Sequence, residues 1–146
     1  MNERARAAWA RTTVQVWPGR YCLVSLPVER LAEVAGALAE ASGFAALVVE
    51  RDEVSLTVPE DRWVRHPLRA AARSDAGPYR ALTLDVNLEL DLTGYLATAA
   101  LRLAEAGVSI VPQCAFLKDH LLVPEEHLER AVGVLEALVR EAKGAG

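Results

Sequence analysis

The feature that most constrains the folding of this 146-residue chain is an internal repeat with an offset of 65 residues. The equivalent pairs are Leu31 and Leu96, Leu38 and Leu103, Leu56 and Leu121, Val58 and Val123, Pro59 and Pro124, and Glu60 and Glu125. The string Leu-Ala-Glu-Ala also occurs twice, at 38–41 and at 103–106. The offset is longer than the roughly 20 to 50 residues of solenoid repeats, so the pattern indicates a duplicated small domain.

Hydrophobic periodicity predicts the same order of elements in both halves, namely strand, helix, strand, strand, helix. The predicted strands are 12–16, 21–26, 44–49, 54–58, 79–90, 108–114 and 121–123, and the predicted helices are 29–41, 93–106 and 125–142. Residues 1–11 are either a short helix or a frayed end. The Pro18-Gly19 turn signal predicts a hairpin or a bent strand, and Pro67 predicts a short broken helix within 60–73.

Each half is too short to bury a core comfortably alone, so the two halves are expected to share a sheet. Residues 75–78 are the best linker candidate, because glycine, proline and polar residues gather there. The predicted units are therefore 12–75 and 76–143.

Composition excludes several classes of function. A net charge of -4 with scattered arginines argues against a nucleic-acid surface, which would show a basic patch. Cys22 and Cys114 each lie in an apolar run without metal-ligand spacing, which is typical of free thiols in a reducing cytosol. The charged N-terminus does not fit a signal peptide, and no apolar run reaches the roughly 18 residues of a membrane span. We expect a cytoplasmic protein with no cofactor and no metal.

The most informative turn is Asp91-Leu92-Thr93-Gly94, between a predicted strand and a predicted helix. The first amides of a helix carry partial positive charge, and a glycine lets a small anion approach them closely. Asp91 or Thr93 could instead cap the helix with its own oxygen. The equivalent residues of the first half include Pro27, which lacks an amide, and Glu29, which is negative, so that copy is a poor anion site.

The motifs of both halves resemble those of small bacterial tandem-ACT proteins, which are related to aspartate kinase regulatory domains and to arginine-sensor proteins. In the first half the matching features are Tyr21, Phe44 and the Asp-Glu-Val-Ser motif at 52–55. In the second half they are the Leu-Thr-Gly turn at 92–94, the Leu-Ala-Glu-Ala-Gly helix end at 103–107, and the strand 119–123. The resemblance covers roughly residues 12–138.

This resemblance implies an α+β fold of two ferredoxin-like (βαββαβ, ACT-type) units packed as a tandem repeat with antiparallel sheets. It also implies an amino acid bound at the seam between units, or between protomers of a homodimer. The backbone amides of 91–95 would meet the ligand's charged backbone, and Glu89 and Asp119 would hold its ammonium or a basic side chain. The implied ligand-binding residues are Glu53, Val54, Ser55, Glu89, Asp91, Leu92, Thr93, Gly94, Tyr95, Cys114, Ala115, Phe116 and Asp119.

The sequence departs from the pattern of that group at several positions. Val86, Asn87 and Glu89 stand where the group has a glycine-proline pair and an aspartate, and Cys114-Ala115-Phe116 stand where it has Ser-Thr-Tyr. His120 replaces an aromatic phenol.

No residue spacing suggests a nucleophile paired with a base, so we expect no enzyme. The histidines are dispersed, and Asp119 and His120 would face opposite sides of a strand. We therefore predict a non-catalytic regulatory module that binds a small amino acid. The acidic pair Glu89 and Asp119 favours a basic or plain zwitterionic one. The alternative is a ligand-free structural or protein-interaction module on the same fold, and both predictions include a homodimer without nucleic-acid or membrane partners.

Overall fold

The computed structural model describes residues 1–39 and 42–144, which divide into two compact units. Unit 2 is continuous and runs from Trp17 to Ala81. Unit 1 is built from both ends of the chain, namely residues 1–16 together with the chain from Leu82 onward. The predicted ranges 12–75 and 76–143 group 12–16 with the first half, whereas these residues lie in unit 1.

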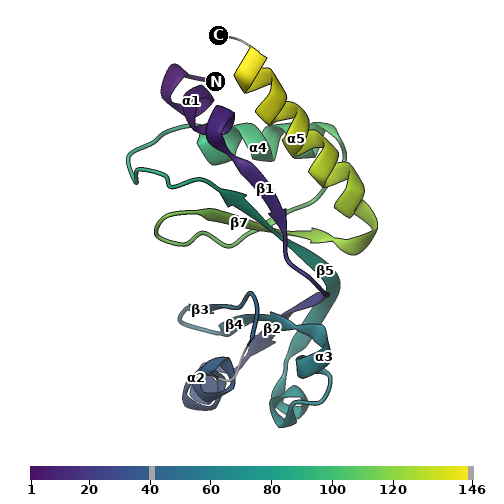
Figure 1. The fold of residues 1–146 in the computed structure, drawn as a ribbon. Helices are drawn as coiled ribbons and strands as arrows, with labels where there is room; N and C mark the ends of the chain where they lie inside the picture. Colours follow the sequence, from purple (N-terminus) through teal and green to yellow (C-terminus); the bar gives the residue numbers. More distant parts are fainter. Residues whose placement is uncertain (40–41, 145–146) are drawn as a thin grey trace. The chain divides into compact units, whose positions relative to one another are not determined.

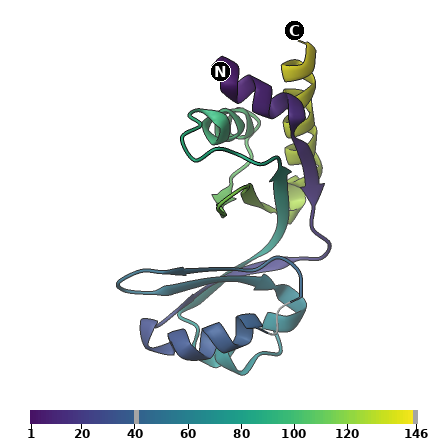
Figure 2. The same ribbon diagram turned by 60° about the vertical axis from the view of Figure 1, so that its left-hand side comes forward.

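Unit 2 is an antiparallel sheet with strand order β3-β4-β2-β5, in which β5 contributes its first part. Helices α2 and α3 lie on the same face of this sheet (Figure 2). The elements are β2 (Tyr21–Leu26), η1 (Val28–Arg30), α2 (Leu31–Ala39), β3 (Ala46–Val49), β4 (Val54–Pro59), α3 (Glu60–Trp63), η2 (Pro67–Ala71) and β5 (Ser74–Asp85). Their order is therefore strand, helix, strand, strand, short helices, strand.

Unit 1 has the strand order β6-β7-β5-β1, with the last part of β5 inside and the N-terminal strand at one edge. Helices α1, α4 and α5 pack against one another in this unit (Figure 1). The elements are α1 (Glu3–Arg11), β1 (Thr13–Val16), α4 (Tyr95–Glu105), β6 (Val111–Pro112), β7 (Asp119–Pro124), η3 (Glu125–His127) and α5 (Leu128–Gly144).

The cores follow the predicted periodicity. In unit 1 the buried side chains include Trp9, Tyr95 and three leucines from α4, β7 and α5, namely Leu103, Leu121 and Leu135. In unit 2 they include Val24, Leu26, Val34, Leu56 and Trp63. The equivalent repeat positions Leu56 and Leu121 are thus both core residues, Leu56 in unit 2 and Leu121 in unit 1.

Most predicted elements are confirmed within one to four residues, including the break that Pro67 introduces between α3 and η2. The predicted strand 108–114 is reduced to the two residues of β6. The predicted helix end at 40–41, with the last two residues of the first Leu-Ala-Glu-Ala string, lies outside the described residues.

Of the two alternatives predicted for 12–16 and 21–26, the hairpin is wrong, because both segments pair in turn with β5, as the two parts of a bent strand would. β1 pairs with the last part of β5, where Val14 faces Leu84 and Val16 faces Leu82. β2 pairs with β4 and with the first part of β5. Alternating polarity identifies a half-buried strand but does not identify the strand beside it.

The predicted linker at 75–78 is also wrong, because these residues lie inside β5, opposite β2. Gly77 has φ +151°, and a Cβ there would lie 2.9 Å from the Tyr21 carbonyl oxygen. The glycine therefore allows two strands to approach closely at a register shift, a use of glycine that composition alone does not distinguish from a turn.

Two features are not found within the described part of the chain. No helix there is both long enough and apolar enough to cross a bilayer. No group of three or more histidine, cysteine, aspartate or glutamate side chains is placed to hold a metal ion.

Two leucines of α4 test the assigned core, because Leu103 is fully buried and Leu101 is 60% exposed. We expect Leu103→Ala to lower the free energy of unfolding by about 2 to 5 kcal/mol, through lost apolar burial and the cavity left behind. Leu101→Ala should change it by less than about 0.5 kcal/mol. Urea titration of both variants measures the difference, and equal losses would contradict the assigned orientation of α4.

Candidate functional site

The predicted turn lies at the N-terminus of α4, and its glycine adopts a left-handed backbone conformation that favours glycine. Gly94 is the N-cap residue with φ +86°. Neither Asp91 nor Thr93 caps this helix, since no side-chain hydrogen bond caps α4 within the described residues. Of the two alternatives that the sequence left open, the helix capped by Asp91 or Thr93 is therefore not the one observed.

The N-terminal residues of α1 lie against this turn. The Asn2 side chain donates from Nδ2 to the Thr93 carbonyl oxygen at 2.9 Å and to Thr93 Oγ1 at 3.3 Å. Its Oδ1 accepts from the Ala5 backbone N–H at 2.8 Å and so caps α1. One side chain thus fixes both the start of α1 and the turn before α4.

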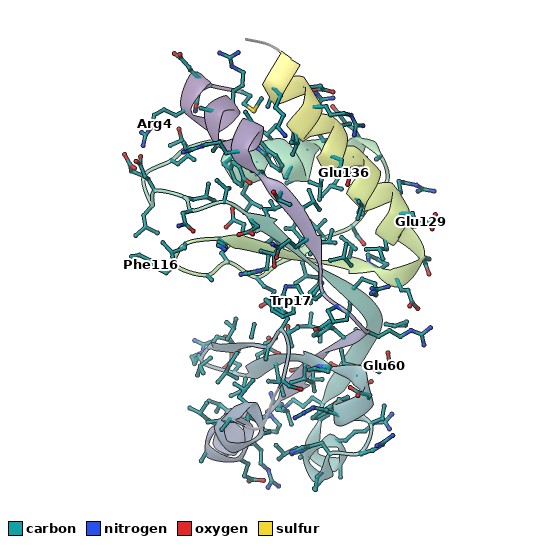
Figure 3. All side chains as sticks on the ribbon, in the orientation of Figure 1. Arg4, Trp17, Glu60, Phe116, Glu129 and Glu136 are labelled. Carbon is teal, nitrogen blue, oxygen red and sulfur yellow. The ribbon has the colours of Figure 1, made fainter. Side chains whose placement is uncertain are left out.

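Arg4 holds the acidic side chains of the same loop. Its guanidinium Nη2 lies 2.6 Å from Glu89 Oε2 and 3.0 Å from Asp91 Oδ1, and Nη1 lies 3.2 Å from Asp91 Oδ2. The hydrogen bonds to Asp91 and then Glu89 raise the pKa of Arg4, and the same arginine lowers the pKa of Asp91. Figure 3 labels Arg4 at the outer surface of unit 1, where solvent screens these charges.

A hollow of about 250 Å³ lies between the first turn of α1 and the loop before α4. Its lining residues are Asn2, Glu3, Arg4, Leu92 and Thr93. Three carboxylates, from Glu3, Glu89 and Asp91, lie on or beside this hollow against the single guanidinium of Arg4. The local charge therefore favours a ligand with a positive group.

The side chain of Tyr95 belongs to the core and not to the hollow. Its ring stacks on Trp9 with a centroid distance of 4.5 Å, and its hydroxyl lies 2.7 Å from Thr12 Oγ1. Burial raises the pKa of Tyr95, the Thr12 hydrogen bond lowers it, and the charge of Asp119 raises it. Of Tyr95, only the backbone N–H can serve a ligand at the helix N-terminus.

The other predicted residues of unit 1 lie in the loop between β6 and β7 and at the first position of β7. Its turn is closed by the Ala115 N–H donating to the Lys118 carbonyl at 2.9 Å. It is joined to the loop before α4 by the Leu88 N–H donating to the Leu117 carbonyl, also at 2.9 Å. The structure thus brings the two predicted segments of unit 1 together.

These predicted residues differ in exposure. Phe116 is 74% exposed and is labelled at the surface in Figure 3, whereas Asp119 is half-buried. Cys114 as a whole is exposed, but its thiol is partly buried. This burial, and then a hydrogen bond with Asp119, raises the pKa of the thiol to about 11. The thiol is therefore protonated at neutral pH and is a poor nucleophile.

Glu53, Val54 and Ser55 lie in unit 2, where the turn after β3 leads into the first residues of β4. Val54 is buried in the core of that unit, and Ser55 faces Ser25 across the β2–β4 pair. Ser25 Oγ donates to the Glu53 carboxylate. These contacts give each of the three residues a role inside unit 2.

Asn2, Arg4 and Trp9 are not among the predicted site residues, because the sequence of residues 1–11 fits a short helix and a frayed end alike. The signal was present, since an asparagine followed by a glutamate is a typical helix start. That Trp9 would pack on Tyr95, 86 residues away, could not be read from any local pattern.

The chain is similar to one protein family and to several solved structures. A family model described as the ACT domain matches residues 77–137, and no curated protein matches the sequence significantly. A solved structure of a protein from Agobacterium tumefaciens is similar with a TM-score of 0.71 at 24% identity, over 88% of this chain and 90% of that chain. A Vibrio cholerae protein described as of unknown function and a possible transport protein gives 0.69 at 20%, over 92% and 94%.

The regulatory subunit of aspartate kinase from Thermus flavus is similar with a TM-score of 0.62 at 16% identity, over 87% of this chain and 95% of that chain. Likeness at these identities shows a shared fold. The family match supports the expected ACT-type character over residues 77–137, and the shared fold confirms the antiparallel α+β architecture.

The imidazole of His120, on β7, lies 2.8 Å from Thr83 Oγ1 on β5 and supplies a pH test of this region. Burial lowers the pKa of His120 from its ordinary value of 6.5, Asp119 opposes that shift, and Lys118, which is ion-paired with Asp85, adds to it. The folded state therefore binds the proton less well than the unfolded state. The free energy of unfolding should fall as the pH drops below about 6.5 toward the folded-state pKa.

His120→Gln should flatten this part of the stability–pH curve, because an amide can still bond Thr83 without titrating. Urea titrations between about pH 5 and 8 check the slope, and an NMR titration of the imidazole checks the pKa directly. A pKa at or above 6.5 would contradict the burial of this ring.

Proposed function

We propose that this chain is a non-catalytic regulatory module that binds a small amino acid, built as two ACT-type units in tandem. The ACT match over 77–137 and the fold shared with aspartate kinase regulatory subunits support this proposal. The observation that carries it is the left-handed Gly94 at the N-terminus of α4, with the carboxylates of Glu89 and Asp91 beside it. An amino acid has the two opposite charges that such a pair of surfaces recognises.

The ligand's carboxylate is assigned to the first backbone amides of α4, from Gly94 and Tyr95 onward. An 11-residue helix presents its positive end there, and Gly94 adds no side chain to block the approach. The ammonium is assigned to Glu89, with Asp119 at the start of β7 as the second acid. Leu92, Thr93, Cys114, Ala115 and Phe116 would line the remaining walls.

The turn of unit 2 that corresponds to Gly94 is unsuited to the same ligand. There the chain enters a 3-10 turn after Pro27, and Glu29 places a negative charge in its first turn. Glu53, Val54 and Ser55 are proposed as ligand-binding residues contributed by a second protomer. We further propose that the protein is a homodimer, that it is cytoplasmic, and that it is related to arginine-sensor proteins.

Titration of the purified protein with each of the twenty amino acids, followed by thermal unfolding, tests this function. A ligand at a free concentration of 100 times its Kd raises the free energy of unfolding by about 2.7 kcal/mol. In a chain of this size that raises Tm by roughly 5 to 10 °C. Gly94→Val should abolish the response, because its side chain and its strained φ close the approach to the α4 amides.

Gly107→Val is the matched control, because Gly107 has φ +71° at the other end of α4 and its Cβ would meet nothing within 4 Å. It carries a similar backbone strain but should keep the ligand response. A folded protein that responds to none of the twenty amino acids would exclude the proposed function.

Arg4→Ala provides a second test, because Arg4 occupies the carboxylates that the ligand's ammonium needs. Its removal should lower the Kd for the responding amino acid, as measured by calorimetry. Arg11→Ala is the control, since Arg11 lies on the same helix and hydrogen-bonds the Ala7 carbonyl. A higher Kd in Arg4→Ala alone would instead make Arg4 part of the ligand's binding surface.

The second candidate is a protein-interaction module without a ligand. The exposed apolar side chains of Leu90, Phe116 and Leu117 favour it, because the loops that carry them are joined at Leu88 and Leu117. The Gly94→Val variant separates the two candidates, since an interaction module has no amino-acid response to lose.

A further inference from the structure

The first turn of α1 supplies hydrogen-bond donors to the loop before α4. Asn2 Nδ2 donates to the Thr93 carbonyl oxygen at 2.9 Å, and Arg4 donates to the carboxylates of Glu89 and Asp91 at 2.6 and 3.0 Å. A carbonyl oxygen and carboxylates are also the acceptors that an ammonium group binds. The protein's own side chains therefore hold the acceptors that a bound amino acid would need.

Asn2 also lies against the glycine on which the proposed site depends. A Cβ built on Gly94 would lie 3.6 Å from Asn2 Nδ2, which is van der Waals contact. The hollow that the first turn of α1 helps to line measures about 250 Å³, below the roughly 300 to 1,000 Å³ of small-molecule sites. The space beside Gly94 is thus partly filled by the N-terminal residues.

The first turn of α1 is held less firmly than the rest of the helix. Asn2, Glu3 and Arg4 are exposed, whereas Ala5 and Trp9 are fully buried. Exposed hydrogen bonds and ion pairs contribute little net stability, because water competes for both partners. The boundary between the weakly and the firmly held parts of α1 therefore lies between Arg4 and Ala5.

We propose that residues 1–4 form an autoinhibitory lid, which must leave the loop before an amino acid binds at Gly94. In the closed state Asn2 and Arg4 bond the loop in place of a ligand. In the open state the turn unwinds as far as Ala5, while Trp9 keeps the remainder of α1 in the core. This inference rests on the proposed function, and it makes the apparent affinity the intrinsic affinity reduced by the fraction of open molecules.

Asn2→Ser separates the two roles of Asn2. Serine is also a favourable N-cap residue, so its hydroxyl can replace Asn2 Oδ1 as the acceptor for the Ala5 N–H. The shorter side chain cannot reach Thr93 as well, so the closed state loses one or two exposed hydrogen bonds. Calorimetric titration with each of the twenty amino acids should show the same responding amino acids as the unmodified protein, with a Kd about two- to tenfold lower.

Asn87→Ser is the matched control, because it makes the same exchange at an exposed position of the loop before α4. It leaves the contacts of the lid intact and should leave the Kd unchanged.

Exchange of backbone amides with water, measured by NMR, reports the opening itself. In the closed state the Ala5 N–H donates to Asn2 Oδ1 at 2.8 Å, and the Arg6 N–H donates to the Asn2 carbonyl oxygen at 3.0 Å. Saturation with the responding amino acid should speed the exchange of both amides. The Thr12 N–H, which donates to the Trp9 carbonyl oxygen at 3.1 Å, should exchange at an unchanged rate.

The outcomes separate the lid from the proposed function. If the unmodified protein responds to none of the twenty amino acids, both fail together. If it responds, the lid alone is overturned when Asn2→Ser binds no more tightly, when Asn87→Ser tightens binding equally, or when the exchange of Ala5 and Arg6 slows or stays the same on saturation.

Discussion

The arrangement of unit 1 depends on one buried contact, the packing of Trp9 against Tyr95. The indole is fully buried, stacks on the phenol ring and donates to the Tyr95 carbonyl at 3.2 Å. The Tyr95 hydroxyl then bonds Thr12, the residue between α1 and β1. Buried aromatic pairs stabilise through large apolar area as well as ring geometry. This contact fixes α1 to the first turn of α4, and β1 follows directly at the edge of the sheet.

The same contact determines the surroundings of the candidate site. With Trp9 held in the core, the first turn of α1 lies over the loop before α4, where Asn2 and Arg4 bond that loop. The two ends of α1 differ in character, because Trp9 is anchored by burial whereas the Arg4 contacts are exposed and screened by solvent. A ligand can therefore compete with the outer contacts while the inner anchor keeps unit 1 folded.

The candidate site was only partly predictable. Gly94 and the turn around it follow from local chemistry, because a glycine before an amphipathic run is a position for a left-handed residue. Glu89 and Asp91 were identified as acidic, but their partner Arg4 lies 85 residues or more away in the sequence. Tyr95 was placed in the site by resemblance, and its side chain lies in the core because Trp9 and Thr12 bind it.

The sequence by itself determined the local elements, the duplicated pattern of core leucines, the glycine that opens α4 and the break at Pro67. These features follow from the side-chain spacing and backbone freedom of neighbouring residues, which the printed order contains in full. Only the tertiary structure decided which strands pair, that β1 joins the C-terminal half, that 75–78 is strand instead of linker, and that Arg4 meets Glu89 and Asp91. Those outcomes depend on contacts between residues far apart in the chain, whose energies no local pattern encodes.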